Sequence, residues 1–330
     1  MRKISYIIQE SDSGLTVEQV LRREFQMGRA GLVRAKKIEN GITLDGQHAF
    51  TIHPVFPGQE LAIVISDADL EPHACTIEPQ EGPIDIVFED LDVIALNKPA
   101  SLVVHPSPGH KDQTLSNYLL HYFKCTNKNY NLHPCHRIDL GTSGLILFAT
   151  SSYAQDMIQK QLHTQSFQRT YLALCEGRFE QKEGSIEAPL DRLTVHPSTF
   201  GISQTGKYAL THYRVLGESS IPNNLCRHTS VPESTCCSSE EKTIISLVEL
   251  TLETGRTHQI RIHMASISHP LLGDATYGHP SDFIDRHALH SWQAYFNHPI
   301  TKERITLTAP LPNDMAQLIT PELRNKLETT

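Results

Sequence analysis

The chain of 330 residues has no apolar run of the roughly 18 residues that a membrane-spanning helix needs, so we expect no segment to cross a bilayer. Residues 1–6 read as a short strand and lack the apolar core and cleavage site of a secretory signal peptide. The seven cysteines include no Cys-x-x-Cys pair, so the sequence indicates neither a disulfide framework nor a zinc site. These absences favour a cytoplasmic protein.

Signatures of cofactor and metal binding are also missing. The sequence contains neither a Walker-type phosphate loop nor a dinucleotide-binding fingerprint, so no nucleotide cofactor is expected. His258 and His263 stand five residues apart on one predicted helix, but no His-Glu-x-x-His motif and no third ligand at a useful spacing accompany them. We therefore expect no cofactor and no metal, and we interpret these histidines as packing and hydrogen-bonding residues.

An excess of basic residues is lacking as well. The formal net charge is −8, which argues against a simple nucleic-acid-binding protein. Charges act over only about 8–10 Å in physiological salt, however, so a local groove can still be basic. Basic residues do concentrate in residues 22–37, where Glu24 is the only acid, whereas the acidic excess lies elsewhere, including residues 67–92 and 233–241.

The N-terminal part, residues 1–66, reads as a small α/β module. Val17, Val20 and Leu21 follow Thr16 at helical spacing, so Thr16 is expected to cap a first helix. A second short helix with several basic residues comes next. Two strand-like runs complete the module: 42–46, which ends in an Asp-Gly hairpin turn, and 61–65.

We expect a linker at 67–82, a larger domain at 83–315 and a C-terminal tail at 316–330. Strands and helices do not alternate strictly in the larger domain, which predicts an α+β fold with a mixed, mainly antiparallel sheet. Residues 217–243 are polar and interrupt two strands, so we interpret them as a surface insertion and assign them no function. The expected helices span about 114–123, 154–165 and 257–268.

The run from His136 to Phe148 carries the most chemical information. It places Asp139 two residues after Arg137, in a tight polar turn that leads into a buried apolar strand. A carboxylate with a cationic neighbour can stay ionised in a semi-buried cleft and act as a nucleophile. Taken alone, an aspartate ahead of Gly-Thr-Ser-Gly is more often a turn or cap residue.

Four further segments reverse that balance, because together with the first they resemble, in order, the motifs of the RluA family of pseudouridine synthases. The most specific is Thr-Gly-Arg-Thr-His-Gln-Ile-Arg-Ile-His at 254–263. The others are Asn-Lys-Pro at 97–99 with His-Pro at 105–106, Arg-Thr-Tyr at 169–171, and Leu-His-Ser-Trp at 289–292. The N-terminal module resembles the alpha-L RNA-binding motif that many of these enzymes carry.

The resemblance implies an RNA-modifying enzyme with the pseudouridine synthase catalytic fold, which isomerises uridine to pseudouridine without a cofactor. Asp139 would be the catalytic aspartate, and Arg261 would pair with it and keep it ionised. Tyr171 would stack on the extruded uracil and accept the proton from carbon 5. The residues alone leave other interpretations open, because Tyr171 could be a packed strand residue and Arg261 a surface cation.

The resemblance also implies substrate-binding residues. Arg137 would enter the RNA stack where the target base has left, and Ile260 would line the apolar wall of the pocket. Further substrate contacts are expected from His136, Asn97, Lys98 and His105, and from Arg22, Arg29, Arg34 and Lys37 in the N-terminal module. A solvated basic helix face is the alternative interpretation of the last four residues.

Three positions depart from the family pattern. The two residues after the catalytic aspartate are often charged, commonly Arg-Asp, whereas this chain has Leu140 and Gly141. Ser101 occupies a position where glycine is usual. These departures bear on the substrate range and the loop, and not on the class of reaction.

We therefore expect an enzyme that acts on structured RNA. Large-subunit ribosomal RNA is the favoured substrate, because the N-terminal module is commoner in that branch of the family, and transfer RNA is the alternative. An inactive RNA-binding or ribosome-assembly factor should have lost Asp139, Tyr171 or Arg261, and all three are present. A zinc- or histidine-dependent hydrolase is the third alternative. Nothing in the sequence requires more than a monomer.

Overall fold

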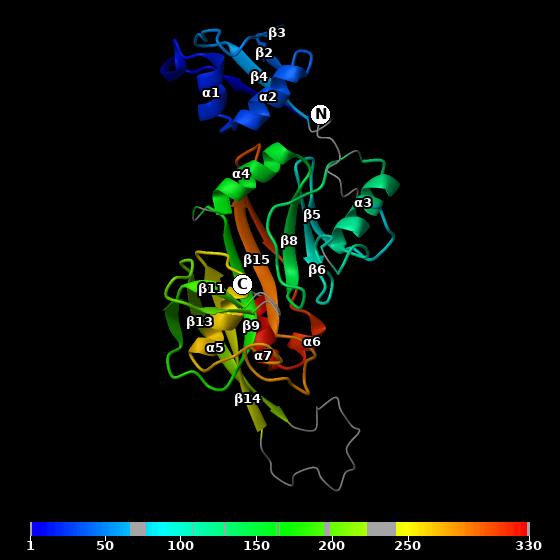
Figure 1. Ribbon diagram of the computed structural model, residues 1–330, viewed down its shortest axis with the longest axis vertical. Coiled ribbons are helices and arrows are strands. Elements are labelled where there is room, and N and C mark those ends of the chain that lie inside the picture. The colour runs from blue at the N-terminus through cyan, green and yellow to red at the C-terminus, as the bar shows by residue number, and fades with distance from the viewer. Residues whose placement is uncertain are drawn as a thin grey trace.

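The structure, a computed structural model, describes residues 2–66, 77–107, 109–128, 130–162, 164, 166–194, 199–222 and 242–328. They form a small N-terminal module, at the top of Figure 1, and a larger domain below it. The module contains a four-stranded sheet, and the larger domain contains a ten-stranded sheet and a separate two-stranded sheet. Within these ranges we find no helix with the length and apolar character that crossing a membrane requires.

The N-terminal module packs two short helices against an antiparallel sheet. Its elements are β1 (Arg2–Ile7), η1 (Glu10–Asp12), α1 (Val17–Arg23), α2 (Arg29–Lys37), β2 (Ile42–Leu44), β3 (Gln47–His48) and β4 (Glu60–Ile65). The strand order is β1-β4-β2-β3. Thr16 caps α1 as predicted, because its hydroxyl accepts a hydrogen bond from the backbone N–H of Gln19 at 3.3 Å. The Asp-Gly turn between β2 and β3 is also confirmed.

The module is attached to the larger domain through α4 (Ser152–Leu162). Tyr153 is buried in the apolar core of the module, and its hydroxyl donates a hydrogen bond to the carbonyl of Phe25 at 2.8 Å. Arg34 on α2 donates a hydrogen bond to the Ser152 hydroxyl at 2.8 Å. The basic helix α2 is therefore held at the end of the larger domain where α4 lies (Figure 1).

The core of the larger domain is a long, curved sheet. Its strands are β5 (Ile86–Glu89), β6 (Val93–Lys98), β7 (His133–Pro134), β8 (Ser143–Ala149), β9 (Gln168–Glu176), β10 (Glu183–Glu187), β13 (Leu210–Pro222), β14 (Lys242–Leu252), β15 (Leu289–Asn297) and β16 (Arg304–Thr308). The order is β10-β13-β14-β9-β15-β8-β6-β5, with β16 beside β15 and β7 beside β8. Of these described strands, only β8 and β15 pair in parallel. The predicted α+β class with a mixed, mainly antiparallel sheet is confirmed.

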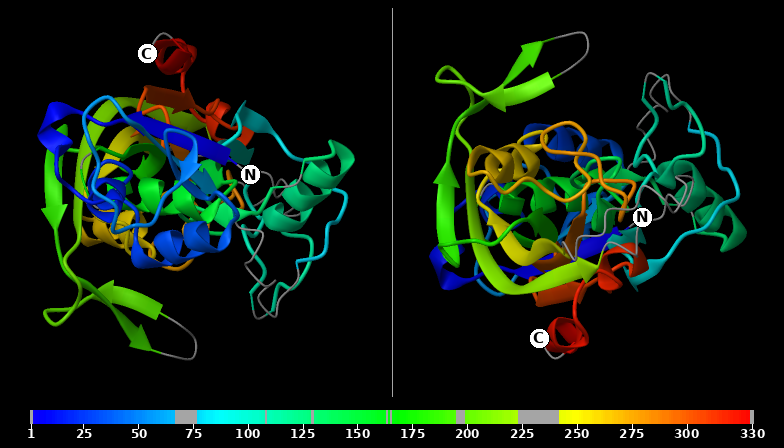
Figure 2. Two further views of the ribbon diagram at one scale, coloured as in Figure 1. Left: turned by 90° about the horizontal axis from the view of Figure 1, so that it is seen from above. Right: turned by 90° about the horizontal axis from the view of Figure 1, so that it is seen from below.

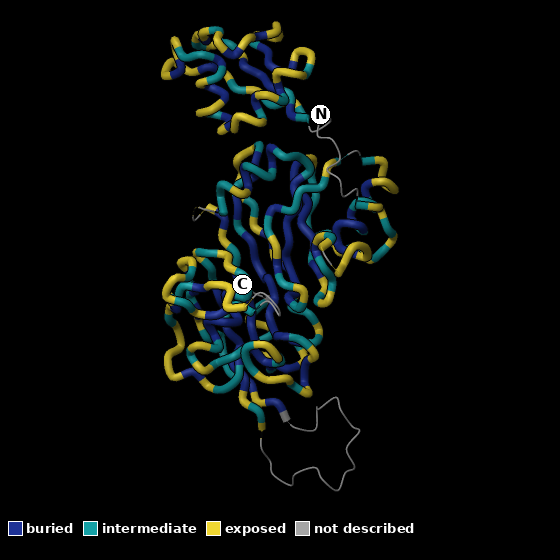
Figure 3. Tube along the Cα trace, viewed as in Figure 1, coloured by how far each residue is buried: buried dark blue, intermediate teal, exposed yellow. Residues whose placement is uncertain are grey.

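The two faces of this sheet carry different helices. Along β9, Tyr171 and Ala173 face one apolar cluster, and Leu172 faces another, because successive side chains of a strand point to opposite faces. The first face carries α3 (Leu115–Cys125) and α5 (Gln259–Ser266), and the second carries α6 (Asn313–Ala316) and α7 (Pro321–Glu328). Figure 2 shows α5 and α7 on opposite sides, and Figure 3 shows the buried strands between them.

The hairpin of β13 and β14 is longer than the sequence suggested. Residues 217–222 and 242–243 were expected in a surface insertion, but they pair in register from Gly217 with Leu247 to Pro222 with Lys242. A polar segment can form a strand here, because the hydrogen bonds between paired strands join backbone groups and do not depend on the side chains. The insertion predicted at 217–243 is therefore too wide, and its remaining residues, 223–241, lie outside the described residues.

The predicted tail and linker also make ordered contacts. In the tail at 316–330, Leu318 and Ile319 are buried, and Leu323 of α7 packs on the same apolar cluster. In the linker at 67–82, the Glu78 carbonyl accepts a hydrogen bond from the Asn117 side chain of α3 at 2.8 Å. Residues 67–76 lie outside the described residues. The division into domains stays a prediction.

The burial of Phe148 gives a test of the core. This β8 side chain has no exposed surface and belongs to the same apolar cluster as Ile94 and Leu96 of the neighbouring strand β6. Phe148→Ala should lower the free energy of unfolding by about 3–5 kcal/mol, because it leaves a cavity that the rigid sheet cannot fill. Denaturant titration measures this, with Leu91→Ala, at a side chain 56% exposed, as the control. Equal loss in both variants would contradict the assignment of the core.

Candidate active site

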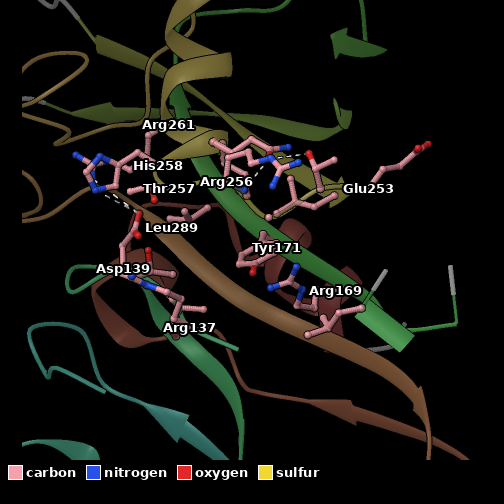
Figure 4. A pocket seen from close by; sticks show the side chains of 18 residues that line it. Arg137, Asp139, Arg169, Tyr171, Glu253, Arg256, Thr257, His258, Arg261 and Leu289 are labelled. Carbon is pink, nitrogen blue, oxygen red and sulfur yellow. Dashed lines mark hydrogen bonds and ion pairs between the residues drawn. The ribbon is translucent and has the colours of Figure 1, made fainter. Parts of the chain in front are cut away.

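Five segments distant in the sequence surround a cavity of about 420 Å³. They are the loop ahead of β8, the end of α4, the first residues of β9, the end of β14 with the turn into α5, and the first residue of β15. Of the predicted site residues, the cavity is lined by Arg137, Asp139, Tyr171, Ile260 and Arg261. Figure 4 shows Asp139 next to His258 and below Arg261, with Tyr171 on β9 to one side of them.

The loop that carries Asp139 is held by its backbone carbonyls. The Asp139 carbonyl accepts a hydrogen bond from the Thr142 N–H at 3.0 Å. The next carbonyl, of Leu140, accepts from the Ser101 N–H at 2.9 Å and from the Lys98 ammonium at 3.2 Å. The third, of Gly141, accepts from Arg286 at 3.0 Å. Lys98 and Arg286 thus fix the backbone of the loop. The Asp139 side chain, 22% exposed, points into the cavity.

Gly144 sets the course of the strand that leaves this loop. Its φ is +101°, and a Cβ atom there would lie 2.2 Å from the carbonyl oxygen of Ser291. Any side chain would therefore both strain the backbone and separate β8 from β15. The glycine of the Thr-Ser-Gly motif is required for the parallel pairing that closes the site.

Arg261 has a closer partner than the predicted one. Its Nε and Nη2 atoms each donate to a carboxylate oxygen of Asp274 at 2.7 Å, a two-point ion pair. Both residues are buried, with relative exposures of 6% and 1%. Burial alone would lower the pKa of Arg261, but the hydrogen bonds and charge of Asp274 outweigh it and raise that pKa. Burial likewise opposes ionisation of Asp274, and its bonds to Arg261 lower its pKa on balance.

The remaining nitrogen of Arg261 faces Asp139. Nη1 lies 3.9 Å from Oδ2 of Asp139, and Nε2 of His258 lies 4.0 Å from the same oxygen. The expected pairing of Arg261 with Asp139 is thus present as a looser contact. Since Asp274 already neutralises the guanidinium, Arg261 can orient Asp139 without binding it tightly.

His258 closes the network in an unusual backbone conformation. Its φ of +56° and ψ of 20° lie in the left-handed region, immediately ahead of α5. Its Nδ1 shares a hydrogen bond with the Tyr277 hydroxyl at 2.9 Å, and the Tyr277 ring lies 5.0 Å from the guanidinium carbon of Arg261. Burial and the charge of Arg261 lower the pKa of His258, although Asp139 opposes them. A neutral imidazole therefore stands beside the carboxylate.

The cavity is positive although the whole chain is negative. Arg137, Arg169, Arg256 and Arg261 line it, against the two acids Asp139 and Glu253. Arg256 is exposed, and its Nε donates to the Tyr208 carbonyl at 3.0 Å. This local excess of arginine explains how a chain of net charge −8 can offer a surface for a polyanion.

The structure corrects the assignment of Lys98 as a substrate-binding residue. Its side chain is completely buried, with 0% exposure, so it reaches no surface. The ammonium donates to the carbonyls of Pro99 at 2.9 Å and Leu140 at 3.2 Å. A lysine in the sequence suggests a surface cation, but this side chain is buried and its ammonium group holds the loop of Asp139 through the Leu140 carbonyl.

Other predicted contacts lie outside the cavity lining. Asn97 donates to the Asp85 carboxylate at 2.9 Å and so links β6 to the preceding chain. The His136 ring packs 5.9 Å from the Phe167 ring, and burial lowers the pKa of His136 to about 3. His105 lies in the loop before α3, with its Nδ1 3.3 Å from the Ser116 hydroxyl.

The predicted basic residues of the module occupy different positions. Arg22 pairs with Glu18 at 2.8 Å on α1. Arg29 and Lys37 mark the two ends of α2, and Arg34 between them bonds to Ser152. Their contacts with RNA stay a prediction.

Two histidines weighed as metal ligands do not converge. His263 bonds to the Thr211 hydroxyl at 2.9 Å and to the Ala188 carbonyl at 3.0 Å, whereas His258 bonds to Tyr277. Within the described ranges, the group with metal-ligand spacing is Asp90, Asp92 and His298, which does not line the cavity.

Several residues in or beside the cavity were not predicted from the sequence. Asp274 and Tyr277 follow α5 in the chain, and only the fold shows that they contact Arg261. Arg169 and Arg256 belong to motifs already singled out, next to the residues chosen from them. His287 gave no signal, yet its Nε2 lies 3.0 Å from the Thr142 hydroxyl beside Asp139.

The buried ammonium of Lys98 predicts a specific dependence of stability on pH. Burial, followed by the charge of Arg286, lowers the pKa of Lys98 to about 7, from 10.5 in a solvated lysine. Between these pH values the unfolded chain binds one more proton than the folded one, so the free energy of unfolding rises with pH. Lys98→Met should lack this rise. Denaturant unfolding between these pH values should show that the free energy of unfolding of the wild type rises relative to that of Lys98→Met. If the two free energies changed with pH in parallel, the burial of the Lys98 amino group would be contradicted.

Comparison with known proteins identifies the family. Residues 92–266, just over half of the chain, match the family model described as RNA pseudouridylate synthase. The matched range contains Asp139, Tyr171 and Arg261.

Full-length relatives agree with this match. The ribosomal large subunit pseudouridine synthase D of Escherichia coli (strain K12) is 32% identical over 332 residues, which cover 96% of this chain and 93% of that protein. The corresponding protein of Nitrosomonas europaea is 31% identical and covers 96% of this chain and 87% of its own length. An RNA pseudouridine synthase of Bacillus subtilis (strain 168) is 38% identical over 248 residues, 75% of each chain.

Solved structures show the same fold. Human RNA Pseudouridylate Synthase Domain Containing 1 has a TM-score of 0.55 at 24% identity, covering 79% of this chain and 98% of its own. Human RNA Pseudouridylate Synthase Domain Containing 4 has a TM-score of 0.54 at 21% identity, covering 73% and 93%. The family model and the full-length relatives show that this chain belongs to the RNA pseudouridylate synthase family, and the solved structures share its fold.

Proposed function

We propose that this RNA pseudouridine synthase acts on uridines of large-subunit ribosomal RNA and that Asp139 is its nucleophile. The observation that carries the proposal is the position of Asp139. Its carboxylate lies on the wall of an arginine-lined cavity, on a loop fixed by Lys98 and Arg286, and faces Arg261 at 3.9 Å.

The reaction asks little of the protein beyond placement and proton transfer. The bond between N1 of uracil and C1′ of ribose breaks, the freed base turns, and C5 forms a bond to C1′. C5 loses a proton and N1 gains one, so the product is an isomer and no cofactor is consumed. We assign to Asp139 the attack on the nucleoside that allows the first bond to break, as carboxylate nucleophiles do in other enzymes.

Tyr171 is our candidate for the group that contacts the uracil. It is 4% exposed, lines the same cavity as Asp139, and shares an apolar cluster with Ile138 and Ile260. An aromatic ring there offers a face on which a flipped base can stack. We propose that its phenol accepts the C5 proton, directly or through a relay, and that Ile260 limits the movement of the base.

The arginines at the mouth suit an RNA whose target nucleotide has left its stack. Arg137 is exposed and lies two residues from Asp139, close enough to fill the space of the extruded base with its planar guanidinium. Arg169 and Arg256 also line the cavity, where they can bind the flanking phosphates.

The choice of ribosomal RNA rests on similarity along the whole chain. The relatives named as ribosomal large subunit pseudouridine synthase D align over 96% of this chain, including the N-terminal module. A transfer-RNA substrate remains the alternative for the test. The inactive-factor alternative is disfavoured because Asp139, Tyr171 and Arg261 meet in one cavity.

We propose further that the enzyme works in the cytoplasm as a monomer without metal. Within the described residues, Cys125, Cys135 and Cys175 are free thiols, which supports a reducing compartment. The polar groups around Asp139 pair with each other and not with a shared ion site.

Removing the proposed nucleophile gives the direct test. Asp139→Ala should lower conversion of uridine in a large-subunit ribosomal RNA transcript by at least about 1000-fold. RNA affinity should largely persist, because the arginines of the cavity remain. The measurements are carbodiimide mapping of the transcript and filter binding, with Asp112→Ala, outside the cavity, as the matched control. Turnover by Asp139→Ala would refute the assignment.

The pair of Arg261 and Asp274 predicts a second effect. Asp274→Asn keeps the shape of the side chain but leaves the buried guanidinium without its counter-charge, so Arg261 should shift towards Asp139. Displacement of reacting groups by about 1 Å can cost roughly 100-fold in rate, and we expect a loss of that order in single-turnover conversion. Glu249→Gln, which neutralises a partly buried carboxylate paired with the exposed Arg214 at 2.9 Å, is the control. A folded Asp274→Asn enzyme of wild-type rate would show that the pair does not position Asp139.

A further inference from the structure

A second cavity, of about 280 Å³, opens between the N-terminal module and the larger domain. Its lining joins Gln26, just after α1, to the end of α4 and to the turn between β15 and β16. We call it the module notch and define it by Gln26, Lys160, Thr164, Ser166 and Lys302.

Two ammonium groups line the module notch. Lys160 forms an ion pair with Asp156 at 2.8 Å and also donates to the Gln26 carbonyl. Lys302 donates to the Pro299 carbonyl at 2.8 Å, and among the described residues it has no carboxylate partner. Burial, and then the charge of Lys160, lower the pKa of Lys302, so the two cations are close enough to repel each other. An anion between them would relieve this repulsion.

Among the other side chains of the notch, the Ser166 hydroxyl can donate a hydrogen bond to a phosphate group, whereas the Thr164 hydroxyl already donates to the Gln161 carbonyl at 3.1 Å. Ammonium groups bind phosphate as mobile point charges. Asp156, the acid paired with Lys160, does not line the cavity. The notch thus presents one neutralised and one uncompensated cation together with one neutral donor, the Ser166 hydroxyl.

The notch adjoins the active cavity. Leu162 and Arg169 line the active cavity, whereas Lys160, Thr164 and Ser166 of the same stretch line the notch. On the other side, Gln26 precedes by three residues the start of α2, the basic helix of the module. A strand of RNA that leaves the active cavity towards α2 therefore meets the notch on its way.

We propose that the module notch binds a backbone phosphate of the RNA whose target uridine occupies the active cavity. This inference rests on the proposed function, because it takes RNA as the substrate of the active cavity. The phosphate seat would link the catalytic site to the N-terminal module, so that both parts bind one RNA in a fixed register. A free inorganic anion offers the same chemistry, and the test below separates the two sources.

The experiment measures how RNA affinity depends on salt. Each phosphate neutralised by a cation adds roughly 0.7 to 0.9 to the slope of log affinity against log salt concentration. Lys302→Met should therefore reduce the magnitude of the slope by about 1 and weaken binding of different RNA sequences equally. The RNA is a large-subunit ribosomal transcript that the wild type converts. Lys326→Met, on α7 and outside the lining of both cavities, is the matched control and should keep the wild-type slope.

A second variant guards against a local change of the turn at Lys302. Ser166→Glu leaves both lysines and their hydrogen bonds in place and puts a carboxylate into the exposed wall of the notch. It should lower RNA affinity and reduce the slope as Lys302→Met does, because the carboxylate competes with the phosphate. Wild-type slopes in both variants would overturn the phosphate seat.

Two parallel measurements keep the outcomes apart. Conversion of uridine by the wild type in the same transcript tests the proposed function, so normal conversion with unchanged slopes in the variants refutes only the notch. Failure of the wild type to convert or bind RNA would refute both. Thermal unfolding with inorganic phosphate tests the other source. Stabilisation that Lys302→Met abolishes, together with an unchanged RNA slope, would make the notch a free-anion site and overturn its role in RNA binding.

Discussion

A single buried guanidinium holds the site together. Arg261 gives two nitrogens to Asp274 at 2.7 Å and turns the third towards Asp139 at 3.9 Å. A buried cation without a partner is costly, and Asp274 removes that cost. Because the charge is already balanced, Asp139 keeps a carboxylate that is oriented but not tightly bound. His258 also approaches the same oxygen of Asp139, at 4.0 Å, and Tyr277 holds His258 through a hydrogen bond at 2.9 Å.

The sheet brings the parts of the site together from remote segments. Parallel pairing of β8 with β15 positions the loop of Asp139, and β9 runs beside β15 and points Tyr171 to the face that α5 covers. The loop itself is fixed through its carbonyls by two buried cations, Lys98 and Arg286. Arginine side chains therefore gather around the cavity although the chain as a whole is acidic. The N-terminal module, which carries the basic helix α2, is attached at one end of the same domain.

Much of this was readable from the sequence. The motifs around Asp139, Tyr171 and Arg261 predicted that these residues meet, and the irregular order of strands and helices predicted the mixed sheet. The pairing of Arg261 with Asp274 was not readable, because it depends on how the chain after α5 folds back. Lys98 was wrongly predicted to bind substrate, because lysine side chains usually lie at the surface and this one is buried. The ends of β13 and β14 were wrongly predicted to lie in a surface insertion, because strand pairing joins backbone groups and does not require apolar side chains.

The proposed function is the isomerisation of uridine in large-subunit ribosomal RNA. The most direct measurement is a carbodiimide map of pseudouridine in ribosomal and transfer RNA from cells with and without the gene. We expect one or a few sites of large-subunit ribosomal RNA to disappear with the gene and all transfer-RNA sites to remain. Loss confined to transfer RNA would contradict the substrate, and an unchanged map in both RNAs would contradict the proposed function itself.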